Sequence, residues 1–185
     1  MRAYLEQVEL FSDQEIDYFL SLGKETVLTK GDYFIREGET AHKVAFVKSG
    51  FLRSFYYSSQ SDEVTYCLSF PNELIAGYSS LITQEKTNEN IQTLTTCELI
   101  EFAKQDIDTL VEANTNWLKF TKLIAENQYV KLEKRIFLLQ KENALTRYKE
   151  LLENQPDYLQ KIPLGYLASY LGISQRHLSR LRKQI

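Results

Sequence analysis

The stretch IPLGYLASYLGISQRHLSRLRKQI at 162–185 decides how the end of the chain folds. Pro163 opens a helix whose inner face has apolar residues at steps of three and four, namely Leu164, Leu167, Ala168 and Leu171. Gly172 ends this helix, because glycine tolerates the left-handed backbone of a sharp helix end. Ser174 then caps a second helix that buries Leu178 and Leu181. Two helices crossing over a short glycine turn are typical of a helix-turn-helix.

The other faces of the second helix carry a dense set of hydrogen-bond donors. In a helix-turn-helix the second helix enters the major groove of DNA with its first residues on the base edges. Arg176 or Arg180 can donate two hydrogen bonds to a guanine, and Gln175 can pair with an adenine. The residues predicted to contact DNA, several of them through phosphates, are Ser174, Gln175, Arg176, His177, Ser179, Arg180, Arg182 and Lys183. The alternative is an ordinary helical hairpin with a solvated basic face.

Charge is distributed unequally along the 185 residues. The net charge is −3, but residues 131–185 carry a balance of +6 and residues 1–130 a balance of −9. Such asymmetry is typical of a chain with one end that binds nucleic acid. A hydrophobic content of 43% and the lack of a long apolar run favour a globular, cytoplasmic protein without a membrane partner.

Metal sites and catalytic motifs are not expected. Cys67 and Cys97 are 30 residues apart in apolar stretches, which favours buried, reduced thiols. His42 is the one histidine in the region predicted to be β-structure, whereas a metal site on such a roll needs two or three histidines and a carboxylate. No nucleophile motif is present, so an enzyme is not predicted.

The first hundred residues predict short helices followed by β-structure. Ser12 and Glu15 form a capping box within 4–22, which indicates one or two short helices. From about Glu25 seven or eight short segments rich in β-branched and aromatic residues follow, separated by glycines and polar turns. They predict an antiparallel sandwich or small barrel.

Helical periodicity returns at Lys104. We expect a short helix over 104–113 and a long one over 115–141, which contains no glycine or proline. Trp117, Phe120 and Ile124 form one apolar stripe that is predicted to pack on the sandwich. A second stripe follows a 3.5-residue repeat and predicts a homodimer interface made by Leu118, Thr121, Ala125, Tyr129, Leu132, Ile136 and Leu139. The alternative is a monomer that buries this helix in its own domain.

In this order the parts resemble the CRP/FNR family of bacterial transcription regulators. The resemblance rests on KGDYFIREGE (30–39), VKSGFLRSFY (47–56), TTCELIEF (95–102), RYKELL (147–152) and the stretch 162–183. It implies a cyclic-nucleotide-binding-like jelly roll, a homodimer, double-stranded DNA as partner and RNA polymerase as a further partner. The family usually adds a β-hairpin wing after the recognition helix, and no wing is evident here.

The resemblance also implies an effector pocket at Tyr66, Glu73, Leu74, Thr87 and Asn88. In relatives that bind cyclic AMP, a glutamate contacts the ribose and an arginine neutralises the cyclic phosphate. Glu73 matches the glutamate, but Thr87 and Asn88 stand where the arginine is expected. A cyclic phosphate without a bidentate guanidinium is costly to desolvate, so cyclic AMP is not the expected effector, and no cofactor is predicted.

The predicted fold class is therefore α+β, in three parts. Residues 1–113 form the sensory β-roll with its flanking helices, 114–141 the dimerisation helix and 142–185 the helix-turn-helix domain. The predicted function is regulation of transcription by a homodimer on a palindromic DNA site, under control of an unidentified effector. The alternative is a ligand-binding or protein-interaction module that does not bind DNA.

Overall fold

The structure, a computed structural model, describes residues 1–184, so Ile185 at the end of the predicted C-terminal domain lies outside the described residues. The chain forms two compact units. The first unit contains 1–54 and 68–125, and the second unit contains 55–67 and 126–185. The domain boundaries expected from the sequence, after 113 and 141, stay predictions.

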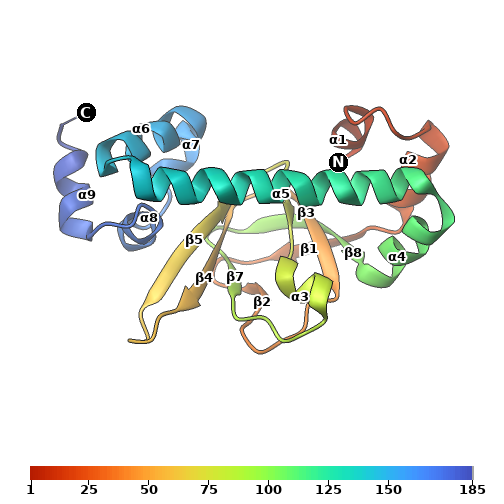
Figure 1. The fold of residues 1–185 in the computed structure, drawn as a ribbon, viewed down its shortest axis with the longest axis horizontal. Coiled ribbons are helices and arrows are strands. Elements are labelled where there is room, and N and C mark those ends of the chain that lie inside the picture. The colour runs from red at the N-terminus through yellow and green to blue at the C-terminus, as the bar shows by residue number, and fades with distance from the viewer. Residues whose placement is uncertain (185) are drawn as a thin grey trace. The chain divides into compact units, whose positions relative to one another are not determined.

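Two four-stranded sheets form the β-structure (Figure 1). One sheet has the order β1 (Lys24–Leu28), β8 (Cys97–Ala103), β3 (Lys43–Ser49) and β6 (Leu74–Ile75). The other has the order β2 (Tyr33–Ile35), β7 (Asn90–Thr93), β4 (Leu52–Tyr57) and β5 (Glu63–Ser69). The pairs β1–β8, β3–β8, β3–β6 and β2–β7 are antiparallel, which confirms the predicted antiparallel β-architecture.

The core between the two sheets is formed mainly by strand residues whose side chains point to the inner faces of the sheets. Ala45, Val47, Leu52 and Leu99 are fully buried in it, together with Phe34, Ile35, Ile75, Ile91 and Cys97. Successive residues of a strand point to opposite faces, so the residues between these core positions face away from the core. Gly50 turns β3 into β4 with φ +80°, in the left-handed region that favours glycine.

A second apolar cluster of the first unit joins helices to the outer face of β8. It contains α1 (Arg2–Glu6), α2 (Asp13–Ser21), α4 (Lys104–Ala113) and the start of α5 (Thr115–Lys141). Trp117 and Phe120 pack in it on Phe102, as the first stripe of the long helix predicts. The capping box is also confirmed, because the Ser12 side chain accepts the Glu15 N–H while the Glu15 carboxylate accepts the Ser12 N–H.

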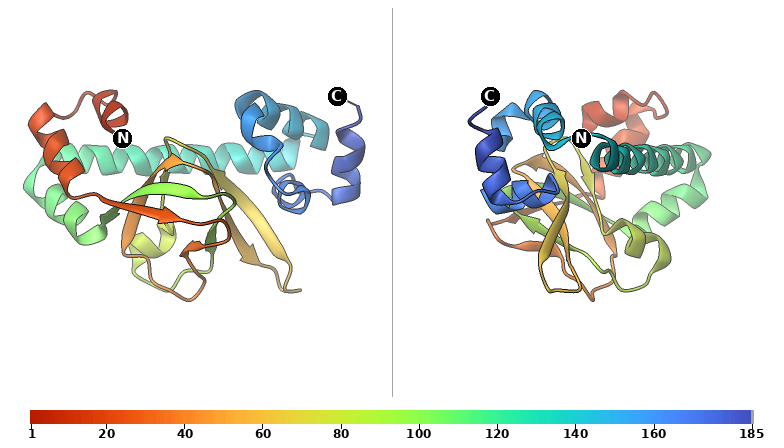
Figure 2. Two further views of the ribbon diagram at one scale, coloured as in Figure 1. Left: turned by 180° about the vertical axis from the view of Figure 1, so that it is seen from behind. Right: turned by 60° about the vertical axis from the view of Figure 1, so that its left-hand side comes forward.

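Helices make up most of the second unit (Figure 2). After the C-terminal part of α5 the chain forms α6 (Ala144–Asn154), α7 (Pro156–Leu159), α8 (Leu164–Tyr170) and α9 (Gln175–Leu181). Asn143 caps α6, since its side chain accepts the Thr146 N–H at 3.0 Å. Within residues 1–184, no helix has the length and apolarity that a bilayer-spanning segment requires.

Candidate nucleic-acid interface

The turn between α8 and α9 is a Schellman motif centred on Gly172. The Ile173 N–H donates to the Ala168 carbonyl and the Gly172 N–H to the Ser169 carbonyl, both at 3.0 Å. Gly172 has φ +66°, the left-handed conformation that this motif requires. Two residues later Ser174 caps α9, because its hydroxyl accepts the His177 N–H at 3.2 Å. The predicted helix end and helix start are therefore both confirmed.

The inner faces of the two helices are buried. In α8 the exposed fraction is at most 1% for Leu167, Ala168 and the C-cap residue Leu171. In α9 it is 0% for Leu178. Leu181 adds to the same packed face at 6%. Side chains on the opposite side of α9 therefore have a fixed direction, because the helix cannot rotate without exposing Leu178.

The outer face of α9 carries the residues predicted to contact DNA. The exposed ones are Ser174, Gln175, Arg176, Arg180, Arg182 and Lys183, while His177 and Ser179 are half-buried. Gln175 leans on α8, since its Nε2 atom lies 3.1 Å from where a Cβ at Gly165 would stand. Arg180 also lies in the last turn of α9, where a cation interacts favourably with the helix dipole. Five of the eight residues carry a cationic or titratable nitrogen, on a segment without acidic side chains.

Arg147 of α6 is a structural residue that the sequence did not reveal. Arg147 is 9% exposed, and its guanidinium donates to three backbone carbonyls, those of Leu171 (3.0 Å), Leu139 (3.3 Å) and Glu142 (2.6 Å). Leu171 is the C-cap of α8, and Leu139 lies in the last turn of α5. One side chain therefore satisfies orphan carbonyls at two helix ends and ties α5, α6 and α8 together.

Two further contacts within the second unit hold α8. The Ser169 hydroxyl accepts the Thr65 N–H at 2.9 Å and donates to the Glu63 carbonyl, which connects α8 to the start of β5. Arg135 of α5 donates to the Tyr170 carbonyl, and its guanidinium lies 3.8 Å from the centre of the Tyr170 ring. Burial lowers the pKa of the Arg135 guanidinium from its ordinary value. These contacts fix α8 on both sides of its last turn.

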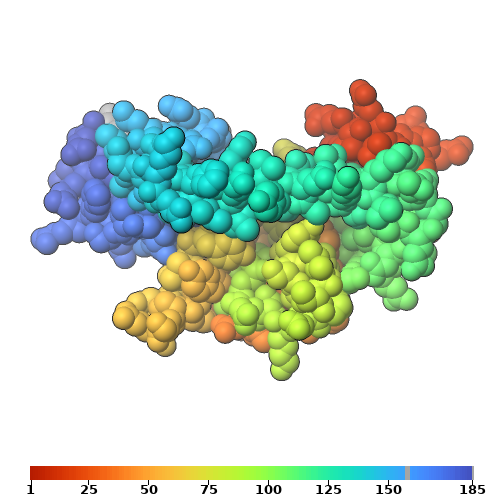
Figure 3. Space-filling view, viewed as in Figure 1, coloured from red at the N-terminus to blue at the C-terminus, as the bar shows by residue number. Residues whose placement is uncertain are grey.

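The long helix α5 leaves its second apolar stripe in solvent. Leu118, Tyr129, Leu132, Ile136 and Leu139 are 39–66% exposed, whereas Thr121 and Ala125 are half-buried. Leu123, Val130 and Phe137 are exposed on the same helix. Figure 3 shows this helix, coloured green to teal, uncovered along its length. A large apolar strip on one exposed helix marks an interaction surface.

The five residues predicted to form an effector pocket belong to two units, and a shared pocket stays a prediction. Tyr66 belongs to the second unit, where its ring lies 6.2 Å from that of Tyr56. In the first unit the Glu73 carboxylate accepts the Phe70 N–H at 3.0 Å, and Asn72 beside it has φ +70°.

The other three residues have different surroundings. Thr87 is buried, and its backbone bonds to Gly38 and Glu39, so it holds the turn after β2. Asn88 is exposed, and Leu74 lines an apolar cavity that excludes Glu73, Thr87 and Asn88.

Cys67 and Cys97 are not joined in a disulfide. Cys97 is fully buried, and burial raises the pKa of its thiol, while Cys67 is half-buried. The prediction of buried thiols is confirmed for Cys97, whereas Cys67 in β5 lies only partly inside.

Comparison with known proteins places the roll in a domain class. Residues 25–114, from β1 to the end of α4, match the model of the cyclic nucleotide-binding domain. That stretch is therefore a domain with the cyclic nucleotide-binding fold. No curated protein sequence matches the chain.

Solved structures extend the likeness beyond the roll. FixK2 from Bradyrhizobium japonicum has a TM-score of 0.78 at 15% identity, over 88% of this chain and 83% of its own. A Eubacterium rectale protein described as a transcriptional regulator of the CRP/FNR family has a TM-score of 0.74 at 16% identity, over 98% and 87%. The c-di-GMP-responsive global regulator CLP of Xanthomonas campestris has 0.66 at 18%, over 94% and 91%. These likenesses concern the fold.

Proposed function

We propose that this chain is a transcription regulator of the CRP/FNR type, which binds a palindromic DNA site as a homodimer. The observation that carries the proposal is the α8–α9 pair, a helix-turn-helix by its Schellman turn, its serine cap and its buried inner face. This packing directs Arg176, Arg180 and Lys183 outward on a segment that has no carboxylates. The likeness of fold to proteins named as regulators supports the same conclusion.

The proposed reading of DNA assigns different roles to the residues of α9. Arg176 and Arg180 lie near the start of the helix and one turn on, where side chains reach base edges, and each bidentate contact discriminates by about 1–3 kcal/mol. The contacts to phosphates are assigned to Ser174, His177, Arg182 and Lys183. Gln175 and Ser179 are four residues apart and lie on a common face of the helix. Gln175 already contacts α8, so its amide is oriented before DNA binds.

Dimerisation through α5 is the second part of the proposal. The exposed stripe from Leu118 to Leu139 would bury its apolar surface against a second copy, in the manner of a coiled coil. Two copies present two α9 helices, and such pairs read half-sites about 34–36 Å apart. Replacing Leu132 by Glu would place two like charges in that seam, whereas Asn127→Glu, at an exposed position on the opposite face of α5, serves as the control. Sedimentation should find the Leu132→Glu chain as a 21.6 kDa monomer and the control as a dimer.

Control by cyclic AMP is not part of the proposal. Thr87 stands where an arginine would neutralise the cyclic phosphate, and its backbone is committed to Gly38 and Glu39. Cyclic AMP and cyclic GMP are therefore expected to leave the melting temperature unchanged, because a ligand of the native state would raise it by mass action.

Selection of duplexes from random DNA tests the DNA-binding function. The proposal expects a twofold symmetric consensus with half-sites one helical turn apart. Arg180→Ala should relax one base position per half-site, whereas Lys183→Ala should weaken all sequences alike and lower the salt slope by about one. Lys149→Ala, an exposed lysine on α6, is the control. If neither Arg180→Ala nor Lys183→Ala altered DNA binding, the proposal would be wrong, and the alternative of an interaction module that does not bind DNA would be favoured.

A further inference from the structure

A cavity of about 290 Å³ lies within the first unit, between the outer face of a sheet and residues of the helices α2, α3, α4 and α5. Val44 of β3 and Phe102 of β8 line it from the sheet. On the same two strands, Ala45 of β3 and Leu99 of β8 point to the opposite face, into the core between the two sheets. The cavity is thus separated from the interior of the roll by the sheet itself.

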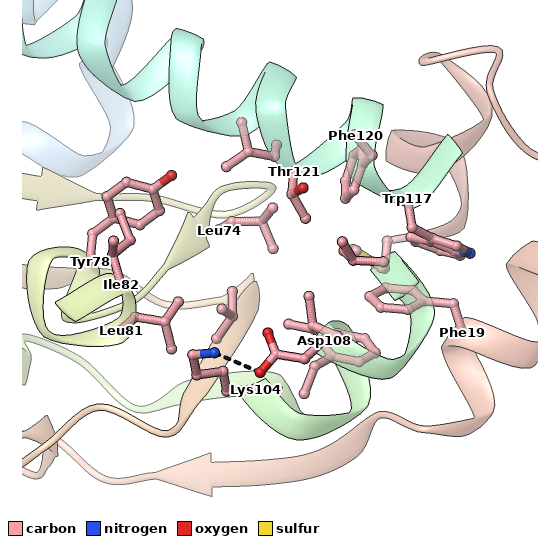
Figure 4. A pocket seen from close by; sticks show the side chains of 16 residues that line it. Phe19, Leu74, Tyr78, Leu81, Ile82, Lys104, Asp108, Trp117, Phe120 and Thr121 are labelled. Atoms are coloured by element: carbon pink, nitrogen blue, oxygen red, sulfur yellow. Dashed lines mark hydrogen bonds and ion pairs between the residues drawn. The ribbon is translucent and has the colours of Figure 1, made fainter. Parts of the chain in front are cut away.

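Its walls are predominantly apolar. The helix α3 (Tyr78–Thr83) contributes Leu81 and Ile82, and the first part of α5 contributes Trp117, Phe120 and Ile124. Figure 4 shows Leu81 and Ile82 of α3 on the opposite side of a common space from Trp117 and Phe120 of α5, with Leu74 of β6 between them. Twelve of the sixteen lining residues have apolar side chains, those of valine, leucine, isoleucine, methionine, phenylalanine and tryptophan. Such a lining favours an apolar occupant.

The remaining lining residues are polar and lie among this apolar surface. Lys104 and Asp108 form an ion pair with 2.6 Å between Nζ and Oδ2, one turn apart on α4. The side chains of Tyr78 and Thr121 each add a hydroxyl. Burial raises the pKa of the Tyr78 phenol, so this group stays protonated and can donate a hydrogen bond. The side chains of the cavity therefore offer several hydrogen-bonding groups and no net charge, and burial lowers the pKa of the Met1 α-amino group, which favours its neutral form.

Volume and charge together define the ligand class. An apolar cavity of about 150 Å³ holds one benzene molecule, so 290 Å³ corresponds to about a dozen non-hydrogen atoms. An anion would need Lys104 to leave Asp108, and it would lose its hydration to an apolar wall. An uncharged hydroxyl or carbonyl group can accept a hydrogen bond from Tyr78 while the ion pair remains intact. A ligand hydroxyl can also donate to Thr121, whose own hydroxyl donates to the Leu118 carbonyl at 3.0 Å.

We propose that this cavity binds one small uncharged amphiphile, with an alkyl chain or a single ring and one hydroxyl or carbonyl group. The chain or ring lies between Leu81, Phe120 and Ile124, and the polar group lies beside the polar side chains. The site concerns binding alone and does not depend on the proposed DNA-binding function. Because it contacts both α3 and α5, the ligand would fix the first turns of α5 relative to the roll within the first unit.

Trp117 provides a direct reporter, since it is the one tryptophan of the chain and lines the cavity. The probe is 8-bromo-octan-1-ol, whose bromine quenches tryptophan fluorescence on contact. We expect saturable quenching of the full chain, reversal by octan-1-ol, and binding at least about tenfold weaker for the anion 8-bromo-octanoate. Quenching that rises linearly without saturation would overturn the site, and equal binding of the anion would overturn the ligand class.

Substitutions that fill the cavity complete the test. Val111→Phe adds a ring inside it, and Val27→Phe makes the same change on β1 where the side chain is 63% exposed. Val111→Phe should weaken the alcohol at least about tenfold, and Val27→Phe should leave its binding unchanged. If circular dichroism shows that Val111→Phe does not fold, Ile124→Phe fills the same space from α5. Unaltered binding in a folded filling variant would contradict the proposal.

Discussion

Replacing Arg147 by Met removes the guanidinium that joins α6 to the C-terminal ends of α5 and α8 in the second unit. Methionine keeps much of the side-chain length, but the carbonyls of Leu171, Leu139 and Glu142 lose their common donor. A hydrogen bond from a charged group contributes about 1.5–3 kcal/mol, and a buried acceptor left without a partner costs about 1–3 kcal/mol. Part of this loss is offset because a buried charge is also removed. We therefore expect a net loss of about 3 kcal/mol.

Hydrogen exchange measures this loss where it occurs. The Leu178 amide, which donates to the Ser174 carbonyl at 3.0 Å, lies in the packed part of α9 and reports on opening of the second unit. The control is Lys149→Met, which changes an exposed residue of α6, the helix that also contains Arg147. It should alter the protection of the Leu178 amide by less than about 0.5 kcal/mol. If Arg147→Met lowered protection by no more than this control, the assigned role of Arg147 would be refuted.

Three further predictions concern the first unit. Gly50→Ala should destabilise it by more than about 2 kcal/mol in thermal unfolding followed by Trp117 fluorescence, because a Cβ there would lie 2.3 Å from the Thr96 carbonyl oxygen, whereas Gly31→Ala meets open space and should cost about 1 kcal/mol. Hydrogen bonds from Ser12 lower the pKa of Glu15, so the carboxylate stabilises the fold above the ordinary Glu pKa and this contribution disappears as pH falls through the lowered value. Glu15→Gln should therefore be less stable than the parent at pH 7 and equally stable in acid, and an unchanged difference at low pH would contradict this. Burial raises the pKa of Cys97, so a disulfide reagent at pH 8 should modify Cys67 first and Cys97 only at the rate of unfolding; equal rates would be inconsistent with the buried thiol.

Local signals in the sequence were sufficient for much of the fold. The helix α5 spans Thr115–Lys141 as its unbroken periodicity predicts, and the Ser12–Glu15 and Gly172–Ser174 signals mark real helix ends. These features depend on residues within one or two turns of each other. Short elements were harder, because the two residues of β6 cannot display a period and the N-cap residue of α3, Gly77, has no side chain that could cap the helix.

Long-range contacts were not predictable from one sequence. Arg147 donates to the carbonyl of Leu171, 24 residues away, and a backbone acceptor leaves no trace in residue identity. The cavity beside Trp117 combines residues from four helices and a sheet, so no single stretch could indicate it. The expected effector residues were drawn from the resemblance and stay a prediction, and the backbone contacts of Thr87 to Gly38 and Glu39 could not be read from the sequence.

Sedimentation of the chain with the selected palindromic duplex tests the central claim most directly. We expect two chains per duplex, with an affinity that falls steeply as salt rises, and a complex that no longer discriminates the base pair read by Arg180 when Arg180 is changed to Ala. The same chain should discriminate against a duplex in which one half-site is scrambled. One chain per duplex, or equal affinity for both duplexes, would contradict the account.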